Sequence, residues 1–286
     1  MKKTVLTLQK RKQSKQKITM LTAYDYTTAK LMDDSGVDCL LVGDSLGMVM
    51  LGYDTTVSVT MDDMIHHSKA VARAAKSALV VTDLPFMSYH ASVYDAVYNA
   101  GRLIKEGHAH VVKLEGGRAF SEHIKMITQA SIPVIAHIGL MPQSVLALGG
   151  FKVQGKDYQN AKNIILDALA VEQAGAIAIL LECVPAPLAT LISELVSVPT
   201  IGIGAGVGCD GQVLVYQDML AMYDGVSSKF TKAFAPVGEQ MKTAFKAYCD
   251  DVINHQFPAP IHEFTIDEHI MQNLRQAFLA SDRRDD

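Results

Sequence analysis

Eight short apolar runs, separated by longer helix-like segments, constrain the fold of this chain more than any other feature. The runs are almost continuously hydrophobic and partly β-branched, as expected for strands that are buried on both faces of a sheet. Regular alternation of such strands with helices predicts βαβ units in a parallel sheet. The runs cover Ile18–Ala23, Cys39–Val42, Leu79–Val81, Val111–Leu114, Val134–Ile138, Ala176–Leu181, Thr200–Ile203 and Val213–Tyr216.

The segments between these runs carry helical patterns, and together with the runs they predict the class of fold. Helices are expected over Met61–Lys76, Val93–Lys105, Ser121–Gln129 and Ala161–Glu172. Eight strands alternating with helices in 286 residues favour an α/β fold, the (β/α)8 TIM barrel. A doubly wound open sheet is the alternative. We expect a single (β/α)8 barrel domain over residues 18–263.

Two segments flank the expected barrel. Residues 1–17 form a basic N-terminal arm in which seven positions are Lys or Arg. We interpret the arm as a solvated helix rather than a nucleic-acid-binding segment, because it has no interleaved aromatic residues. In the C-terminal tail, residues 264–286, Ile266, Ile270, Leu274 and Phe278 recur at every fourth position. This spacing predicts an amphipathic helix that packs on the body or on a partner subunit.

Charge, hydropathy and cysteine content argue against several classes of protein. A formal net charge of −4 gives no general attraction to nucleic acid or to anionic membranes. The basic arm is not followed by the apolar stretch of a secretory signal. The longest uncharged run, between Lys125 and Lys152, contains prolines and polar residues that are unfavourable in a membrane-spanning helix. The four cysteines form no C-x-x-C pair. We therefore expect a cytoplasmic protein that binds neither nucleic acid nor membrane.

Charged residues gather where the predicted strands end. Asp44 follows the second strand, Asp83 the third and Glu182 the sixth, while Lys113 and Glu115 lie in and after the fourth. The carboxyl ends of the strands of a parallel barrel share one face, and active sites are built there. Lys113 and Glu115 are two positions apart, so their side chains point to the same side of the strand. The pattern predicts an acidic site with one ammonium group.

Clustered carboxylates in a buried site need a compensating charge, because an isolated buried ion is costly. A set of oxygen ligands with room for water and substrate suits Mg²⁺. For any single aspartate the alternative interpretation is a helix N-cap after a βα turn, a position that favours Asp. That alternative explains several acids and a lysine on neighbouring strands poorly. The sequence therefore predicts a magnesium site.

Two further patterns have less functional interpretations. Gly206–Gly211 matches G-x-G-x-x-G, but it lies at the seventh strand and has no following strand with an acidic residue, so dinucleotide binding is not favoured. His108 and His110 form an H-x-H pair at the entrance of the fourth strand, away from Glu115, and are interpreted as a surface pair. His137 ends the fifth strand and is either a site residue or a buried core histidine.

The motifs at the strand ends resemble those of the ketopantoate hydroxymethyltransferase family (3-methyl-2-oxobutanoate hydroxymethyltransferase). They run in order from about residue 18 to about residue 230, so a chance match is very improbable. The matching segments are Thr22–Tyr26, Leu41–Met48, Asp83–Met87, Val112–Gly117, His137–Ser144, Gly149–Gly155, Leu181–Pro185 and Ile201–Gly206.

The resemblance implies a fold, a reaction and an assembly. The fold is a (β/α)8 barrel of the phosphoenolpyruvate/pyruvate type, and the assembly is a homodecamer. The reaction transfers a hydroxymethyl group from the co-substrate 5,10-methylenetetrahydrofolate to 3-methyl-2-oxobutanoate, with Mg²⁺ bound. Its products are 2-dehydropantoate and tetrahydrofolate, and it is the first step of pantothenate biosynthesis.

The resemblance also assigns roles to residues at matching positions. Asp44, Asp83 and Glu115 match the family's metal-site acids, with Asp44 and Glu115 acting partly through water. Four positions match the residues that contact the 2-oxoacid, namely Asp44, Ser45, Asp83 and Lys113.

Glu182 matches the proton acceptor of the family. It stands apart from the metal ligands in the sequence, as a base should, since a neighbouring cation would weaken its basicity. Gln217 and Ala221 depart from the family pattern, which has His and Gly there. Two other functions stay open from the residues alone. One is a C–C lyase or decarboxylase on the same barrel, and the other is a non-catalytic binding protein.

Overall fold

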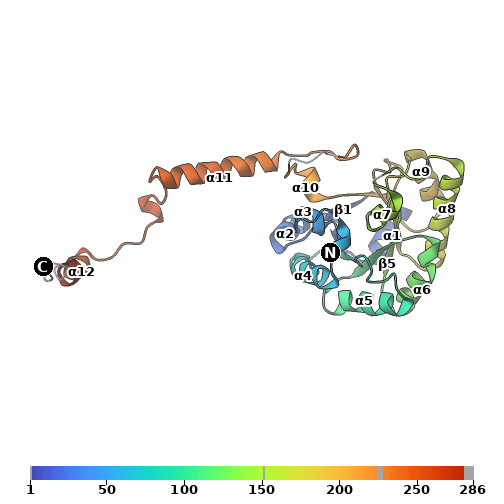
Figure 1. Cartoon of the computed structure of the whole chain (residues 1–286), viewed down its shortest axis with the longest axis horizontal. Coiled ribbons are helices and arrows are strands. Elements are labelled where there is room, and N and C mark those ends of the chain that lie inside the picture. The colour runs from blue at the N-terminus through green and yellow to red at the C-terminus, as the bar shows by residue number, and fades with distance from the viewer. Residues whose placement is uncertain (1, 151, 224–227, 280–286) are drawn as a thin grey trace. The chain divides into compact units, whose positions relative to one another are not determined.

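The computed structural model describes residues 2–150, 152–223 and 228–279, and its core is a closed barrel of eight parallel strands in chain order (Figure 1). The predicted TIM barrel is therefore confirmed. The open sheet is excluded because the first strand pairs with the last, with Ile18 opposite Gly211. The strands are β1 Ile18–Thr22, β2 Cys39–Val42, β3 Leu79–Asp83, β4 Val111–Glu115, β5 Val134–Gly139, β6 Ala178–Glu182, β7 Thr200–Ile203 and β8 Gly211–Leu214.

The eighth strand differs from the prediction. It begins at Gly211 rather than Val213, and Tyr216 begins a short helix instead of ending the strand. The last glycine of the G-x-G-x-x-G pattern thus belongs to a strand. Gly208 packs the preceding loop on a helix, since a Cβ there would lie 2.0 Å from Thr190 Oγ1. These contacts give the glycine pattern a packing role.

Helices surround the strands in the barrel unit (Figure 1). The four helices predicted from the sequence correspond to α4 Met61–Ala74, α5 Val93–Lys105, α6 Ser121–Gln129 and α8 Tyr158–Gln173. Several begin with a side-chain cap: Thr60, Ser92 and Asp157 each accept a hydrogen bond from a backbone N–H in the first turn. The helical elements are α2 Tyr26–Asp34, α3 Leu46–Val49, η1 Thr56–Ser58, α4 Met61–Ala74, α5 Val93–Lys105, η2 Arg118–Phe120, α6 Ser121–Gln129, η3 Pro142–Ser144, α7 Val145–Leu148, α8 Tyr158–Gln173, α9 Ala186–Leu195 and α10 Tyr216–Met219.

Alternate residues along the strands β2–β6 enter two separate apolar clusters. On β4, Val111 belongs to the cluster inside the barrel, and Val112 and Leu114 belong to the cluster between strands and helices. The inside positions become charged toward the carboxyl end, with Lys113 and Glu115 following Val111. The interior of the barrel is therefore apolar toward the amino ends of the strands and charged toward their carboxyl ends.

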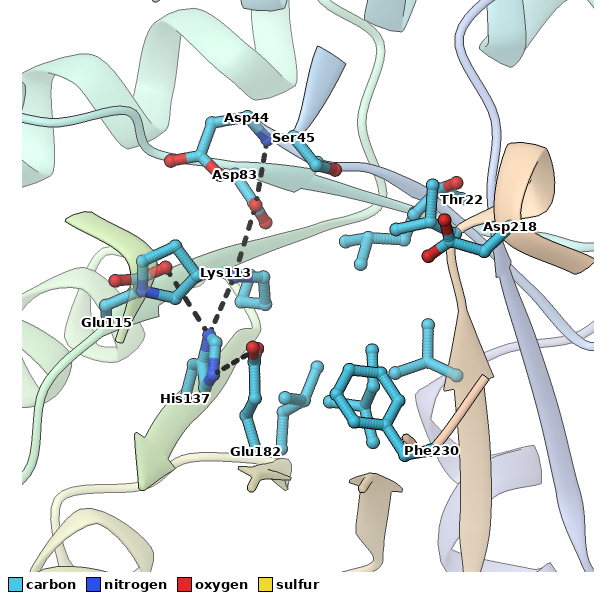
Figure 2. A pocket seen from close by; sticks show the side chains of 17 residues that line it. Thr22, Asp44, Ser45, Asp83, Lys113, Glu115, His137, Glu182, Asp218 and Phe230 are labelled. Atoms are coloured by element: carbon cyan, nitrogen blue, oxygen red, sulfur yellow. Dashed lines mark hydrogen bonds and ion pairs between the residues drawn. The ribbon is translucent and has the colours of Figure 1, made fainter. Parts of the chain in front are cut away.

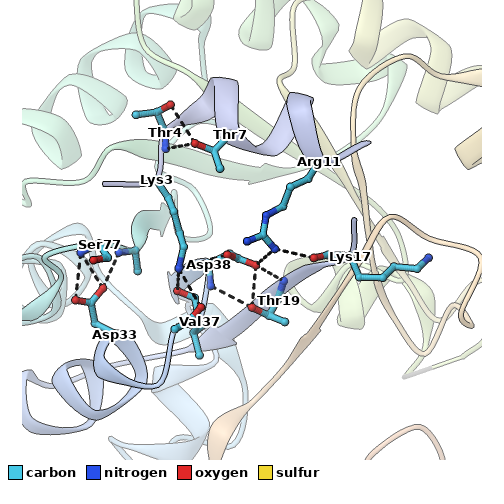
Figure 3. A network of polar contacts seen from close by, with 12 residues as sticks. Lys3, Thr4, Thr7, Arg11, Lys17, Thr19, Asp33, Val37, Asp38 and Ser77 are labelled. Atoms are coloured by element: carbon cyan, nitrogen blue, oxygen red, sulfur yellow. Dashed lines mark hydrogen bonds and ion pairs between the residues drawn. The ribbon is translucent and has the colours of Figure 1, made fainter. Parts of the chain in front are cut away.

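The basic arm is helical but is not simply solvated. Helix α1, Val5–Gln13, places Leu8 in the cluster inside the barrel, where only 1% of its surface is exposed. Arg11 Nη1 lies 2.6 Å from Asp38 Oδ2 (Figure 3). Lys12 Nζ lies 2.8 Å from Asp210 Oδ2. Asp38 and Asp210 immediately precede β2 and β8, so the arm closes the amino end of the barrel. The positive charge of the arm is thus paired with one buried and one half-buried acid, which a local sequence pattern does not show.

Contacts divide the chain into one unit over residues 1–235, which contains the barrel, and another over residues 236–286. The sequence predicts a barrel domain that extends to residue 263. The second unit contains α11 Val237–Ile253, η4 Pro260–His262 and α12 Glu268–Leu279. Three residues of the predicted amphipathic helix, Ile270, Leu274 and Phe278, lie on α12 with exposed side chains. Residues 280–286 of the predicted tail lie outside the described residues. No helix in the described part of the chain is long and apolar enough to cross a membrane.

Candidate active site

All six predicted site residues line one cavity at the carboxyl ends of the strands (Figure 2). Three acids, Asp83, Glu115 and Glu182, are the last residues of β3, β4 and β6, so the strands themselves fix their positions. The structure brings these residues together, and their individual roles stay predictions. The six are Asp44, Ser45, Asp83, Lys113, Glu115 and Glu182, and His137 lines the same cavity.

Lys113 carries the positive charge of the cavity. Its Nζ lies 3.1 Å from Asp83 Oδ2, and both side chains are almost completely buried. Burial alone would lower the pKa of Lys113, but the carboxylates of Asp83, Glu115 and Asp44 raise it above its ordinary value. Lys113 is therefore a permanent cation at neutral pH.

The acids show the opposite response to burial. Burial raises the pKa of Asp83 to about 6, although Lys113 acts to lower it. Burial also raises the pKa values of Asp44 and Glu115 above their ordinary values. A single ammonium group does not neutralise this many buried carboxylates. The site therefore favours the uptake of further positive charge, as protons or as a metal ion.

One carboxylate oxygen, Asp83 Oδ1, is suited to bind a cation. Within the described residues, Asp83 Oδ1 is buried and has no hydrogen-bond donor, while Oδ2 accepts from the backbone N–H of Asp44 at 3.2 Å. A buried acceptor without a donor fits a hard cation. No group of three His, Cys, Asp or Glu side chains in the described ranges converges as a ready set of ligands. The protein would therefore supply part of the coordination shell, which is usual for Mg²⁺.

Gln143 holds two of the acids and was missed by sequence reasoning. Its Nε2 donates to Asp44 Oδ2 at 2.7 Å, and its backbone N–H donates to Glu115 Oε2 at 3.0 Å. The Tyr89 hydroxyl lies 2.9 Å from both Gln143 Oε1 and the Glu115 carbonyl oxygen. Gln143 lies within one of the matching segments, directly after Pro142, and that position was its only signal.

Ser45 lies at the start of α3 on the same rim. Its Oγ is 2.8 Å from the hydroxyl of Tyr24, a residue with 1% exposure. Burial raises the pKa of the Tyr24 phenol above its ordinary value, so this group stays protonated at neutral pH. A buried neutral partner holds the Ser45 hydroxyl at the edge of the cavity, where it can contact a bound anion.

His137, which the sequence left open, is a member of the site. Its Nδ1 lies 3.2 Å from Lys113 Nζ, and its Nε2 lies 3.3 Å from Glu182 Oε2. Burial lowers the pKa of His137, and the charge of Lys113 lowers it further, so the ring is neutral. An ammonium group only donates hydrogen bonds. Nδ1 therefore accepts from Lys113, and the ring hydrogen on Nε2 faces Glu182.

The other histidine pair stays outside the site. His110 precedes β4, and its Nδ1 accepts a hydrogen bond from the backbone N–H of Val80 at 2.9 Å. His108 lies two residues earlier with a left-handed backbone, φ 58°. Both residues lie at the entrance of β4, and Glu115 lies at its exit. This position agrees with the interpretation that the pair has no role in the acidic site.

The two departures from the family pattern have local structural consequences. Gln217 is buried, and its Nε2 lies 3.2 Å from Met50 Sδ. It is not among the residues that line the cavity. Ala221 has a left-handed backbone with φ 47°, a conformation that glycine adopts more readily. Neither departure removes a group from the acidic site.

Comparison with known proteins identifies the family. The family model described as ketopantoate hydroxymethyltransferase matches residues 2–260. The chain belongs to the ketopantoate hydroxymethyltransferase family. It is 63% identical to the 3-methyl-2-oxobutanoate hydroxymethyltransferase of Clostridium novyi and 60% identical to that of Enterococcus faecalis. Each alignment covers 96% of this chain and 100% of the relative.

Solved structures with lower identity share the fold. Phosphonopyruvate hydrolase superposes with a TM-score of 0.61 at 14% identity, over 99% of both chains. A 2,3-dimethylmalate lyase of the PEP mutase/isocitrate lyase superfamily has a TM-score of 0.58 at 15% identity, over 99% of this chain and 97% of that one. These likenesses confirm the expected barrel fold. Family membership confirms a hydroxymethyltransferase, the enzyme of the first step of pantothenate biosynthesis. It does not favour a lyase, a decarboxylase or a non-catalytic binding protein.

Proposed function

We propose that the cavity binds Mg²⁺ and 3-methyl-2-oxobutanoate and transfers to this oxoacid a hydroxymethyl group from 5,10-methylenetetrahydrofolate. The products are 2-dehydropantoate and tetrahydrofolate. The observation that carries the proposal is the grouping of three buried acids and Lys113 at one end of the cavity, with a further acid, Glu182, beside them. The relatives that share the family name support the choice of oxoacid.

The metal would be held by Asp44, Asp83 and Glu115, with Asp44 and Glu115 acting partly through water. The donor-free Oδ1 of Asp83 and the excess of buried carboxylates support this assignment. When bound, Mg²⁺ supplies Lewis-acid polarisation of the 2-oxo group. Gln143 keeps Asp44 and Glu115 in place through its side-chain amide and its backbone N–H.

Ser45 and Lys113 contribute to the binding of the oxoacid. Lys113 Nζ lies between Asp83 and His137 and is positioned to stabilise the negative charge that develops on the substrate oxygen. The stabilisation is larger for the enolate than for the ketone, so it lowers the barrier to proton removal. Ser45 is held by Tyr24 and offers its hydroxyl to the carboxylate.

Glu182 is the proposed base. It takes the proton from C3, and the electrons of that C–H bond form the enolate. C3 then forms a bond to the one-carbon unit, and one water molecule is consumed overall as the product hydroxyl forms and tetrahydrofolate leaves. The Nε2–H of His137 faces Glu182 Oε2 and leaves the other carboxylate oxygen for the substrate proton.

The assembly and location are also proposals. We infer a homo-oligomer, expected to be a decamer, in the cytoplasm. Large apolar side chains of the second unit support association, because Phe245, Ile253 and Ile261 are all more than half exposed. Light scattering coupled to size-exclusion chromatography would measure the assembly directly.

A product assay tests the reaction. The purified protein is incubated with 3-methyl-2-oxobutanoate, 5,10-methylenetetrahydrofolate and Mg²⁺, and 2-dehydropantoate is measured. Omission of either organic substrate, or chelation of the metal, should stop product formation. Product without the folate, or release of carbon dioxide, would contradict the proposal.

A further inference from the structure

The cavity has a second end that the acidic site does not use. In Figure 2, Asp218, Thr22 and Phe230 lie on the side opposite Glu115, and Glu182 lies between the two ends. A small oxoacid bound to the acids and Lys113 occupies the polar end. The remaining walls are apolar and come from Leu41, Leu180, Ile203, Val213 and Val215.

Asp218 is held at this end by the connection between β8 and α10. The Tyr216 N–H, at the start of α10, donates to the Thr22 hydroxyl at 3.1 Å, and Thr22 is 3% exposed. The Asp218 N–H donates to the Val215 carbonyl at 3.1 Å. These bonds fix the short helix on β1 and place the carboxylate at the cavity wall.

The Asp218 carboxylate retains unused acceptor capacity. The Tyr223 hydroxyl donates to Oδ1. In the described ranges, no lysine or arginine forms an ion pair with Asp218. An ionised carboxylate accepts several hydrogen bonds, so Oδ2 is suited to a ligand that presents N–H groups. An anionic group would be repelled here.

Phe230 supplies a flat apolar surface beside this carboxylate. Its ring lies against Gly204, directly after β7, where an added Cβ would be 2.8 Å from the ring Cδ1. The absence of a side chain at position 204 therefore leaves the space that the ring occupies. Phe230 is half-buried, so part of its ring is available to a ligand.

We propose that this end of the cavity binds the pterin ring of the folate co-substrate. Asp218 accepts hydrogen bonds from the 2-amino group and the neighbouring ring N–H, and Phe230 packs against the flat ring. The inference rests on the proposed function, which requires a folate. It adds where the ring binds and which residues recognise it.

The arrangement also accounts for the position of the base. Glu182 lies between the two ends in Figure 2, so a carbon atom activated at the acidic end meets a one-carbon donor from the Asp218 end beside Glu182. The one-carbon unit of the folate can then reach C3 of the oxoacid, and the two substrates do not compete for the same protein groups.

Two activities distinguish the role of the acidic end of the cavity from that of the Asp218 end. With Mg²⁺ and no folate, the protein should exchange the C3 hydrogen of 3-methyl-2-oxobutanoate in D₂O, a reaction that needs only the acidic end. Asp218→Asn should raise the KM for 5,10-methylenetetrahydrofolate roughly tenfold or more, because a charge-assisted bond pair is weakened. Phe230→Leu should raise the same KM several-fold. Exchange should stay within about twofold of wild type for both variants.

Matched variants control for charge and folding. Glu122→Gln removes one negative charge from an exposed position on α6 and should change neither activity. Asp218→Glu keeps the carboxylate and should recover part of the folate affinity. Binding of tetrahydrofolate to the complex with Mg²⁺ and oxoacid, measured by calorimetry, gives a second readout.

Three results would overturn the inference. An unchanged KM for the folate in Asp218→Asn and Phe230→Leu would remove both residues from folate binding. A parallel rise in the KM for 3-methyl-2-oxobutanoate, with slower exchange, would assign this end to the methyl groups of the oxoacid. Wild-type protein that exchanges the C3 hydrogen but forms no product with the folate would refute the proposed transfer, and the folate site with it.

Discussion

The affinity for Mg²⁺ should fall when the pH is lowered from 7 to 5, in the absence of substrate. Burial raises the pKa of Asp83 from 3.8 to about 6, and a metal ion must displace the proton from this carboxyl group. An acid with a pKa of about 6 is roughly nine-tenths ionised at pH 7 and roughly one-tenth ionised at pH 5. Asp83 alone therefore predicts a loss of about tenfold in affinity, or about 1.4 kcal/mol. The raised pKa values of Asp44 and Glu115 make the fall steeper.

The same shift determines how the stability of the metal-free protein changes with pH. The native state holds the Asp83 proton more tightly than the unfolded state, because the folded-state pKa is the higher one. Between about pH 4 and pH 6 the unfolded chain binds fewer protons, so this residue lowers the free energy of unfolding as the pH rises. Saturating Mg²⁺ should offset the loss, and its stabilising effect should be larger at pH 7 than at pH 5.

Isothermal titration calorimetry would measure both effects. Titrations at pH 6 in two buffers with different ionisation enthalpies give the number of protons released for each Mg²⁺ bound. We expect net proton release, and an affinity at pH 5 about a tenth or less of that at pH 7. Equal affinity at both values, or no proton release, would refute the claim that these acids are partly protonated metal ligands.

Three substitutions test separate parts of the molecule. Glu182→Gln should slow folate-independent C3 exchange roughly 10²- to 10⁴-fold, because the base is lost, with little change in oxoacid binding measured by calorimetry. His137→Phe should slow the same exchange roughly tenfold, because Lys113 loses a hydrogen-bonding partner and Glu182 loses the polar ring nitrogen that lies 3.3 Å from its carboxylate. Leu8→Ala should lower the free energy of unfolding in urea by about 2–5 kcal/mol, since this side chain is 1% exposed inside the barrel.

For each substitution, one result would contradict the role that we propose for the residue. Exchange that survives in Glu182→Gln would remove this residue as the base. A His137→Phe variant with normal exchange would show that the imidazole only fills space. Leu6→Ala on the same helix is the control for Leu8, because Leu6 is 64% exposed and its loss should change stability little. Equal effects of the two leucine substitutions would contradict the packing of the arm inside the barrel.

The barrel and its acidic site followed from local patterns. A strand places every second residue on one face, so apolar Val111 predicts that Lys113 and Glu115 also point inward, and both do. The strands extend one or two residues further than their apolar runs at Asp83, Glu115 and Glu182. The apolar pattern ends earlier because these interior positions carry the site.

Long-range contacts were not predictable in the same way. Gln143 comes from a connection after β5, and nothing local indicates that its amide reaches Asp44, 99 positions away. The sequence predicts a solvated helix for the arm, and nothing near the arm in the sequence indicates which acids its charges contact. Those partners, Asp38 and Asp210, are supplied only when distant strands come together.

Closure of the barrel floor by the arm has a consequence for the order of folding. Lys12 and its partner Asp210 are 198 positions apart, and Leu8 packs into an interior built by nearly all the strands. The entropy of closing so long a loop must be overcome before these contacts form. During synthesis, helix α1 therefore cannot form these contacts until the segment before the last strand has left the ribosome. A chain that stops short of Asp210 would keep its basic helix exposed to chaperones and proteases.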